Sequence, residues 1–267
     1  MCPKVAIKTD SLSKRLYAQD ASMYEEIPKG VAFPESGEDI VSLVKQAAAK
    51  KWSITARSAG TSLAGQTTGD GLIIDVSKYM DKVLEWNIEE RWVRVEPGII
   101  RDQLNQMAAT NDLLFGPDTA TTSRCMIGGM IGNNSAGMHS IKYGSTRNHI
   151  LEMEVVLSDG SKMIAKPLNS KQLEEKIALP NLEGHIYREI IELLTEHKEA
   201  ILSQYPHKEI KRRNTGYALD ALCEMSPITD GGRSFNLCEL LAGSEGTLAM
   251  TISCLLYTSP SPRDEQS

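Results

Sequence analysis

The stretch ARSAGTSLAGQ, residues 56–66, says most about how this chain folds. A second stretch rich in small residues starts about sixty positions later at Gly116-Pro117-Asp118 and ends at Gly137. Small side chains let backbone N–H groups approach a ligand closely, and successive N–H groups in a turn form an anion-binding nest. Either stretch alone is also typical of a tight surface turn. Together they predict two loops around one elongated, doubly charged ligand, such as a dinucleotide pyrophosphate.

These loops differ from two common phosphate-binding motifs. Neither has the G-x-G-x-x-G pattern of a Rossmann fold or the G-x-x-x-x-G-K-[ST] pattern of a P-loop. The first loop instead resembles the R-x-G-G-T-S-L-x-G signature of the vanillyl-alcohol-oxidase superfamily, the FAD-binding PCMH-type flavoenzymes. The second resembles the segment of that family that joins P-D to C-x-I-G-G-x-x-x-x-N-x-x-G. A third motif, GSEGTL at residues 243–248, resembles its G-S-E-G-T-L-G segment.

A fourth stretch, KRRNTGYAL at residues 211–219, narrows the resemblance. It is similar to the large bacterial FAD and iron–sulfur D-2-hydroxyacid dehydrogenases, of the D-2-hydroxyglutarate or D-lactate type. The resemblance covers roughly residues 15–253. It implies an α+β fold of two α+β subdomains with a helical insertion, cut off before a C-terminal substrate domain. The expected divisions are an N-terminal segment (1–26), the FAD-binding domain (27–167), a mostly helical insertion or connection (168–235) and the start of the FAD-linked oxidase C-terminal region (236–253).

The last residues, 254–267, do not belong to this resemblance. With one choice of codons, CLLYTSPSPRD at residues 254–264 is the translation of a transposase adapter used in preparing sequencing libraries. An ordinary polar tail is the alternative, because such tails are common. We expect an artefact, which leaves an N-terminal fragment that ends near Ser253 in the middle of a strand.

Hydrophobic periodicity predicts the elements between these motifs. Ser36 is expected to cap a helix whose apolar face carries Ile40, Leu43, Val44 and Ala47. A second helix carries Ile100, Leu104 and Met107 on one face, and a third carries Ile186, Ile190, Leu193 and Leu194. Strands are expected at residues 30–34, 53–56 and 72–75, and in hairpins at 83–86 with 92–95 and 151–157 with 163–166. Residues 235–241 and 247–252 frame the third motif, and Ser253 is expected in the middle of a strand.

The resemblance implies which residues contact FAD. From the first loop, the pyrophosphate contacts are expected to be Arg57, Ser58, Ala59, Gly60, Thr61 and Ser62. The second set is expected to be Pro117, Asp118, Ser123, Gly128, Gly129, Asn134, Gly137 and Gly144, with Tyr143 beside them. Glu245, Gly246 and Thr247 are expected to meet the flavin from the other side.

Several of these residues have a structural alternative. Arg57 is equally suited to a structural ion pair, and the hydroxyls of Thr61 and Ser62 to local turn capping. For Asp118 the alternative is also turn capping. For Asn134 it is a left-handed backbone conformation, and for Tyr143 it is simple packing. Glu245 has the alternative of a solvated turn residue.

Two positions bear on how FAD is held. Ala59 stands where the resembled family usually has Gly, so FAD affinity falls if that position needs positive φ. Thr61 stands where covalently flavinylated relatives place a linking His, so we expect non-covalent FAD. A thioether from Cys125 is the alternative, and a small packed thiol is favoured over it.

Composition limits the partners. The net charge of −6 and pI near 5.5 disfavour nucleic acid as the main partner, and the basic run at residues 208–213 is interpreted as a solvated face. No run of eighteen apolar residues indicates a transmembrane segment. The five cysteines form no C-x-x-C pair, so we expect no metal here and place the iron–sulfur cluster of the resembled enzymes in the missing C-terminal part. Scattered cysteines suit the cytoplasm, with peripheral attachment to the inner face of the membrane left open.

The resemblance implies oxidation of a small D-2-hydroxy acid, 2-hydroxyglutarate or lactate, by hydride transfer to flavin N5, with an unassigned electron acceptor. A substrate carboxylate needs Arg or Lys, and the hydroxyl proton needs a base such as His. His139 and His149 flank the second loop, but no His spacing suggests a base, so no catalytic residue is assigned. The alternatives are an inert FAD-binding fragment and another oxidase or reductase of the superfamily, with a glycolate, carbohydrate or cell-wall-precursor substrate.

Overall fold

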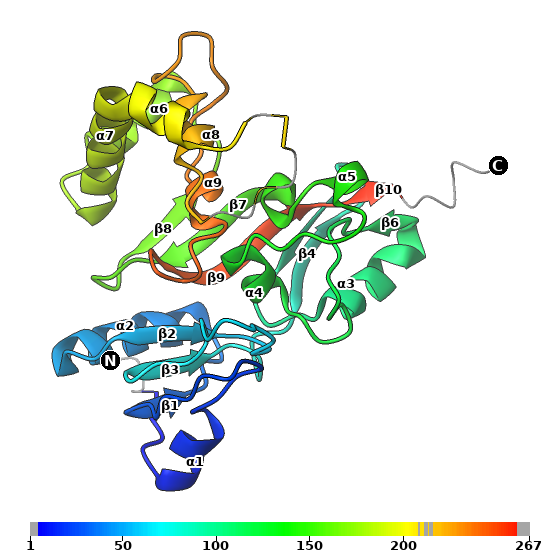
Figure 1. Cartoon of the computed structure of the whole chain (residues 1–267), viewed down its shortest axis with the longest axis vertical. Coiled ribbons are helices and arrows are strands. Elements are labelled where there is room, and N and C mark those ends of the chain that lie inside the picture. The colour runs from blue at the N-terminus through cyan, green and yellow to red at the C-terminus, as the bar shows by residue number, and fades with distance from the viewer. Residues whose placement is uncertain (1–4, 208, 211–212, 214–215, 261–267) are drawn as a thin grey trace.

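The protein is known from a computed structural model that describes residues 5–207, 209, 210, 213 and 216–260. It has a small parallel sheet and a larger antiparallel sheet, with the helices of residues 168–235 at the far end of the larger sheet (Figure 1). This arrangement is mixed α and β, as expected from the sequence. The two sheets matter most for function because the loops that leave their strands meet between them.

The small sheet has the order β1-β3-β2, all parallel, from Gly30–Ala32, Leu72–Asp75 and Ile54–Arg57. Helix α1 (Ser11–Leu16) precedes it, and helix α2 (Gly37–Lys50) connects β1 to β2. The predicted cap is confirmed, because the Ser36 side chain accepts a hydrogen bond from the Asp39 N–H. The predicted apolar face is confirmed as well: Ile40, Leu43, Val44 and Ala47 are all buried.

Helix α2 joins the two sheets into one body. Its buried face shares a hydrophobic core with Leu72 and Ile74 of the small sheet, and with Val156, Met250 and Ile252 of the larger one. Gly37 lies so close to the larger sheet that a Cβ there would be 2.8 Å from the Ile252 side chain. The two sheets are therefore held at a fixed distance on this side.

The larger sheet has the order β4-β5-β9-β7-β8, all antiparallel. Both predicted hairpins are present, as β4 (Val83–Asn87) with β5 (Trp92–Val95) and β7 (Ile150–Val156) with β8 (Lys162–Ala165). The central strand β9 (Met250–Tyr257) includes Ser253, as expected, and begins only after the third motif, because Glu245 and Gly246 have positive φ and hold that motif in a turn. A short pair, β6 (Leu113–Leu114) with β10 (Ser259–Pro260), lies at the edge of the fold.

The chain between β5 and β7 forms short helices around the second loop. These are α3 (Arg101–Ala108), η1 (Ala109–Asn111), α4 (Ile127–Gly132), α5 (Ser140–Tyr143) and η2 (Thr146–His149). The predicted face of α3 is partly wrong. Leu104 is fully buried, but Met107 is 51% exposed, and Ala108, one turn after Leu104, takes the second inward position.

Residues 168–235 leave and re-enter the body at one place, where Leu168 and Phe235 pair in an isolated bridge. The helices of this segment are α6 (Ser170–Ile177), α7 (Leu182–Gln204) and α8 (Leu219–Cys223), and α9 (Cys238–Leu241) follows it. On α7, Leu194 is buried and Ile186 and Ile190 pack against the core, but Leu193 is 45% exposed and lies off the predicted face. Among the helices that the structure describes, none combines the length and apolar character needed to cross a membrane.

Candidate functional site

A cavity of about 810 Å³ lies where the ends of β2, β7 and β9 meet the three motif loops. Its size falls within the range of about 300–1,000 Å³ that is typical of ligand and cofactor pockets. The apolar part of the wall includes Met153 and Val155 of β7 and Met250 of β9. The predicted site residues that line the cavity are Arg57, Ser58, Gly60, Thr61, Ser62, Asp118, Gly128, Gly129, Gly137, Glu245 and Gly246.

The first loop, most of which lines this cavity, has a row of free backbone donors. None of the six N–H groups from Ser58 to Leu63 donates a hydrogen bond to a residue that the structure describes. Gly60 has φ +64, so the loop passes through a left-handed turn at that position, whereas Ala59 is not among the residues with positive φ. Ala59 does not need positive φ, so it is not expected to lower FAD affinity.

Arg57 supports the loop from outside. Its guanidinium donates hydrogen bonds to the backbone carbonyls of Tyr17, Gln19 and Thr67, and lies 5.0 Å from the centre of the Tyr17 ring. Its acceptors are backbone carbonyls, so Arg57 has a structural role besides its place in the cavity wall. Of the two loop hydroxyls, that of Ser62 caps a turn by accepting the Ala64 N–H at 3.3 Å.

The glycines of the second loop allow close contact with its neighbours. A Cβ on Gly129 would lie 2.5 Å from the Ser58 hydroxyl of the first loop, and one on Gly128 would lie 2.7 Å from Pro97. A Cβ on Gly137 would lie 2.2 Å from the Asp118 carboxylate and 2.3 Å from the Asp118 carbonyl oxygen. Side chains at these positions would push the loops apart and change the shape of the cavity.

The third motif closes the ring of loops. The Glu245 N–H donates to the Gly132 carbonyl at the end of α4, and the Glu245 carboxylate accepts a hydrogen bond from Gln66 of the first loop at 3.1 Å. The Glu245 side chain therefore contacts the first loop. It is also exposed, as expected for the alternative of a solvated turn residue. Gln66 was missed as a site residue. Its Oε1 is buried with no hydrogen-bond partner among the described residues, which suits a donor group on a ligand.

Other predicted contacts do not line this cavity. Ala59 and Ser123 line a second cavity of about 580 Å³ that shares Arg57, Ser58 and Met126 with the first. Pro117 lies outside both lined regions, and its carbonyl accepts from Arg101.

Four further predicted contacts lie outside both cavities, each with a local role. Asn134 is left-handed with φ 47 and 1% exposed, so the structural alternative describes it better than direct contact. The Tyr143 ring packs against Gly116, and Gly144 has φ +76 where a Cβ would meet Asn148 at 2.6 Å. Thr247 caps its own turn by donating to the Ser244 carbonyl at 2.6 Å.

Residues 28–164, more than half of the chain, match the family model described as an FAD binding domain. The chain belongs to this family. The D-2-hydroxyglutarate dehydrogenase of Pseudomonas putida is 33% identical over 260 residues, which cover 96% of this chain and 25% of that protein. The enzyme of the same name from Pantoea ananatis is 35% identical over 247 residues, or 91% of this chain and 24% of that protein. This chain thus spans about a quarter of the length of both.

Two further matches extend the comparison. The glycolate oxidase subunit GlcD of Bacillus subtilis is 33% identical over 155 residues, 57% of this chain and 33% of that one. A solved structure of alkyldihydroxyacetonephosphate synthase superposes with a TM-score of 0.64 and 17% identity, over 97% of this chain and 38% of that one. This structural match shows that the two chains share a fold.

The titratable side chains near the cavity have structural partners. His139 Nδ1 lies 2.9 Å from the Asp118 carboxylate, and the buried His149 lies between the carbonyl oxygens of Tyr143 and Tyr257. Cys125 is 5% exposed and accepts a hydrogen bond from the Thr119 hydroxyl, and burial raises the pKa of its thiol. Within the described residues, no group of three or more His, Cys, Asp or Glu side chains could hold a metal ion.

Proposed function

We propose that this chain is the FAD-binding part of a flavin-dependent oxidoreductase that oxidises a D-2-hydroxy acid, with 2-hydroxyglutarate as the first candidate. The observation that carries the FAD assignment is the row of unpaired N–H groups from Ser58 to Leu63 beside a cavity of cofactor size. Such a row binds an anion because each N–H carries partial positive charge and no internal acceptor competes for it. The similarity to D-2-hydroxyglutarate dehydrogenases supports the substrate class.

The proposed contacts follow from this arrangement. The amides of residues 58–63 hold the pyrophosphate. Gly128, Gly129 and Gly137 let the second loop approach the cofactor, and Glu245 with Gly246 form the opposite wall. Pro117, Ser123, Asn134, Tyr143, Gly144 and Thr247 act through the loops that they hold. The apolar wall of Met153, Val155 and Met250 excludes water from the cofactor. Bound FAD would supply the hydride acceptor, and the chain's own contribution is binding and orientation.

The catalytic base and the substrate-carboxylate partner are proposed to lie outside this chain. The described residues that line the cavity include no histidine or lysine, and the cation among them, Arg57, is engaged by three carbonyls. A hydroxy acid needs a cation for its carboxylate and a base for its hydroxyl proton. The lack of a free cation and a base among these residues supports a second candidate function for this sequence, an FAD-binding fragment without turnover.

The first test is FAD stoichiometry. The purified chain, stripped of flavin, is titrated with FAD while the quenching of flavin fluorescence is followed. One FAD per chain is expected, and acid precipitation is expected to release it intact because the attachment is non-covalent. A folded chain that shows no saturable quenching would overturn the assignment.

The second test concerns the substrate and uses the full-length protein that this proposal implies. Bleaching of its bound oxidised flavin is followed anaerobically with D-2-hydroxyglutarate, D-lactate and glycolate, with L-2-hydroxyglutarate as the control. We expect bleaching with D-2-hydroxyglutarate at the lowest concentration. The glycolate oxidase subunit is the observation behind the runner-up substrate, and bleaching by glycolate alone would select it. A failure of all three acids would reject the substrate class while leaving FAD binding intact.

The domain divisions at residues 26, 167, 235 and 253 remain part of this proposal, as does the cytoplasmic location. The adapter origin of residues 254–267 has a direct test, which is to resequence the gene across these codons from unfragmented DNA. The expected result is a different sequence after residue 253.

A further inference from the structure

A buried arginine outside the cavity connects the segments that form its walls. We propose that Arg147 of η2 is a positioning residue for the cofactor, because it fixes the third motif against the second loop. The inference rests on the proposed function, since it concerns how the FAD cavity keeps its shape. Arg147 lines neither cavity, and its side chain is 12% exposed.

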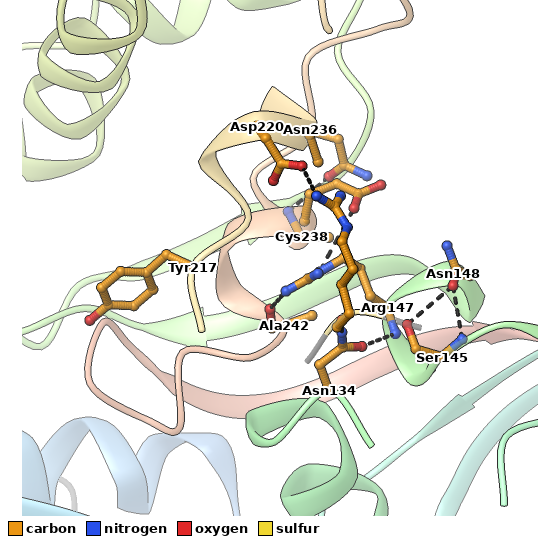
Figure 2. Close-up of polar contacts among 12 residues, drawn as sticks. Asn134, Ser145, Arg147, Asn148, Tyr217, Asp220, Asn236, Cys238 and Ala242 are labelled. Atoms are coloured by element: carbon orange, nitrogen blue, oxygen red, sulfur yellow. Dashed lines mark hydrogen bonds and ion pairs between the residues drawn. The ribbon is translucent and has the colours of Figure 1, made fainter. Parts of the chain in front are cut away.

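The guanidinium of Arg147 joins two distant parts of the chain. One nitrogen, Nη2, donates to the carbonyl of Ala242, which immediately precedes the third motif, and to the carbonyl of Gly216 at 3.3 Å. Figure 2 shows this side chain reaching Ala242 from η2. Nε lies 3.9 Å from the Glu239 carboxylate, which balances part of the buried charge. Burial lowers the pKa of Arg147, and nearby Glu239 offsets part of this shift.

The backbone of Arg147 holds the second loop. Its N–H donates to Asn134 Oδ1 at 2.9 Å (Figure 2). Asn134 Nδ2 donates in turn to the Arg213 carbonyl at 3.4 Å. Asn134 can accept this bond because its left-handed backbone, φ 47, turns the chain at the end of α4. One residue thus contacts the second loop through its amide and the approach to the third motif through its side chain.

Gly243 lies so close to the Arg147 guanidinium that a side chain at this position would collide with it. Gly243 has φ +89, and a Cβ there would lie 2.8 Å from Arg147 Nη2 and 2.9 Å from the Gly216 carbonyl oxygen. The Gly243 N–H in turn donates to the Ile131 carbonyl of α4 at 2.9 Å. Glu245 and Gly246, which line the cavity, follow within three residues. A shift of the backbone at Gly243 would therefore move the cavity wall.

A purely structural arginine would stabilise the fold without affecting the cofactor, and the test separates the two roles. FAD affinity, melting temperature without FAD, and visible circular dichroism of the bound flavin are measured for the wild-type chain, Arg147→Met and Arg147→Lys. Leu194→Ala is the first control, because it removes a fully buried side chain of α7 far from the motifs in sequence. Arg188→Met is the second, because Arg188 also donates to two carbonyls, those of Ile177 and Leu179.

For Arg147→Met we expect FAD binding weakened by roughly tenfold or more, since the carbonyls of the buried Ala242 and the exposed Gly216 lose a charged donor, and an altered flavin dichroism at saturation. Arg147→Lys should fall between this variant and the wild type, and it decides the question if Arg147→Met does not fold. The two controls should melt earlier yet bind FAD with unchanged affinity and dichroism. Wild-type affinity and dichroism in both Arg147 variants would overturn the inference. A wild-type chain that binds no FAD would instead reject the proposed function, and this inference with it.

Discussion

Substituting Gly60 by Ala tests the conformation of the first loop. Gly60 has φ +64, a left-handed conformation that an L-residue with a Cβ adopts at a cost of about 1–2 kcal/mol. The neighbouring substitution Ala59→Gly is the matched control, because Ala59 is not among the residues with positive φ. The two variants exchange the same two residue types at adjacent positions.

The structure sets the size of the effect. A Cβ at Gly60 would lie 3.0 Å from Arg57 Nη2, and this guanidinium has little freedom to move because three carbonyls hold it. The strain of about 1–2 kcal/mol corresponds to a melting temperature lowered by about 2–8 °C. If the loop relaxes to escape the strain, its free N–H groups no longer converge, and FAD binding weakens by roughly five- to thirtyfold.

Two measurements check this prediction. Thermal unfolding without FAD gives the stability change, and fluorescence titration gives the dissociation constant for FAD. Ala59→Gly should change FAD affinity by no more than about twofold, because the position needs no positive φ. If Ala59→Gly tightens FAD binding and Gly60→Ala leaves it unchanged, the left-handed turn has been placed at the wrong residue and the argument fails.

The remaining predictions concern other contacts. Gly137→Ala should weaken FAD binding roughly tenfold or more because its Cβ would overlap the Asp118 carbonyl oxygen, whereas Gly132→Ala, with its nearest neighbour at 3.6 Å, should bind like the wild type in the same titration. Tyr17→Phe should lower the free energy of unfolding by about 1–3 kcal/mol in urea, because the Asp75 carboxylate, 4% exposed, loses a donor; an unchanged value would contradict this. Burial and Asp75 raise the pKa of Tyr17, so its contribution is present below its ordinary pKa of about 10 and is lost as the pH rises above it; Tyr17→Phe should flatten stability against pH in that range. Cys125→Ser should leave FAD fully extractable by acid, as in the wild type, and flavin that stays on the wild-type protein after precipitation would instead indicate a thioether.

Local signals in the sequence were enough for the parts of the fold that depend on neighbouring residues. Ser36 and the apolar spacing after it define α2, and Asp159-Gly160 defines the turn between β7 and β8. The faces of α3 and α7 were less predictable. Met107 and Leu193 have the expected spacing, but the surface that each helix packs against decides which side is buried, and that surface comes from distant segments.

The site could be predicted where small residues signal it and not where it depends on tertiary contacts. The three loops meet at one cavity, as their motifs suggested. Which residue carries the positive φ, Gly60 or Ala59, depends on how Arg57 braces the loop against Tyr17 and Gln19. Arg147 gave no sequence signal because its partners come from segments up to 95 positions away.

The central claim is that the free amides of residues 58–63 hold the pyrophosphate of FAD. Hydrogen–deuterium exchange of this peptide, with and without FAD, tests it most directly, because unpaired amides exchange fast until a ligand bonds to them. The account predicts fast exchange without FAD and clear slowing with it, while the peptide around Leu194 in α7 is unchanged. Saturable FAD binding with no slowing in residues 58–63 would contradict it.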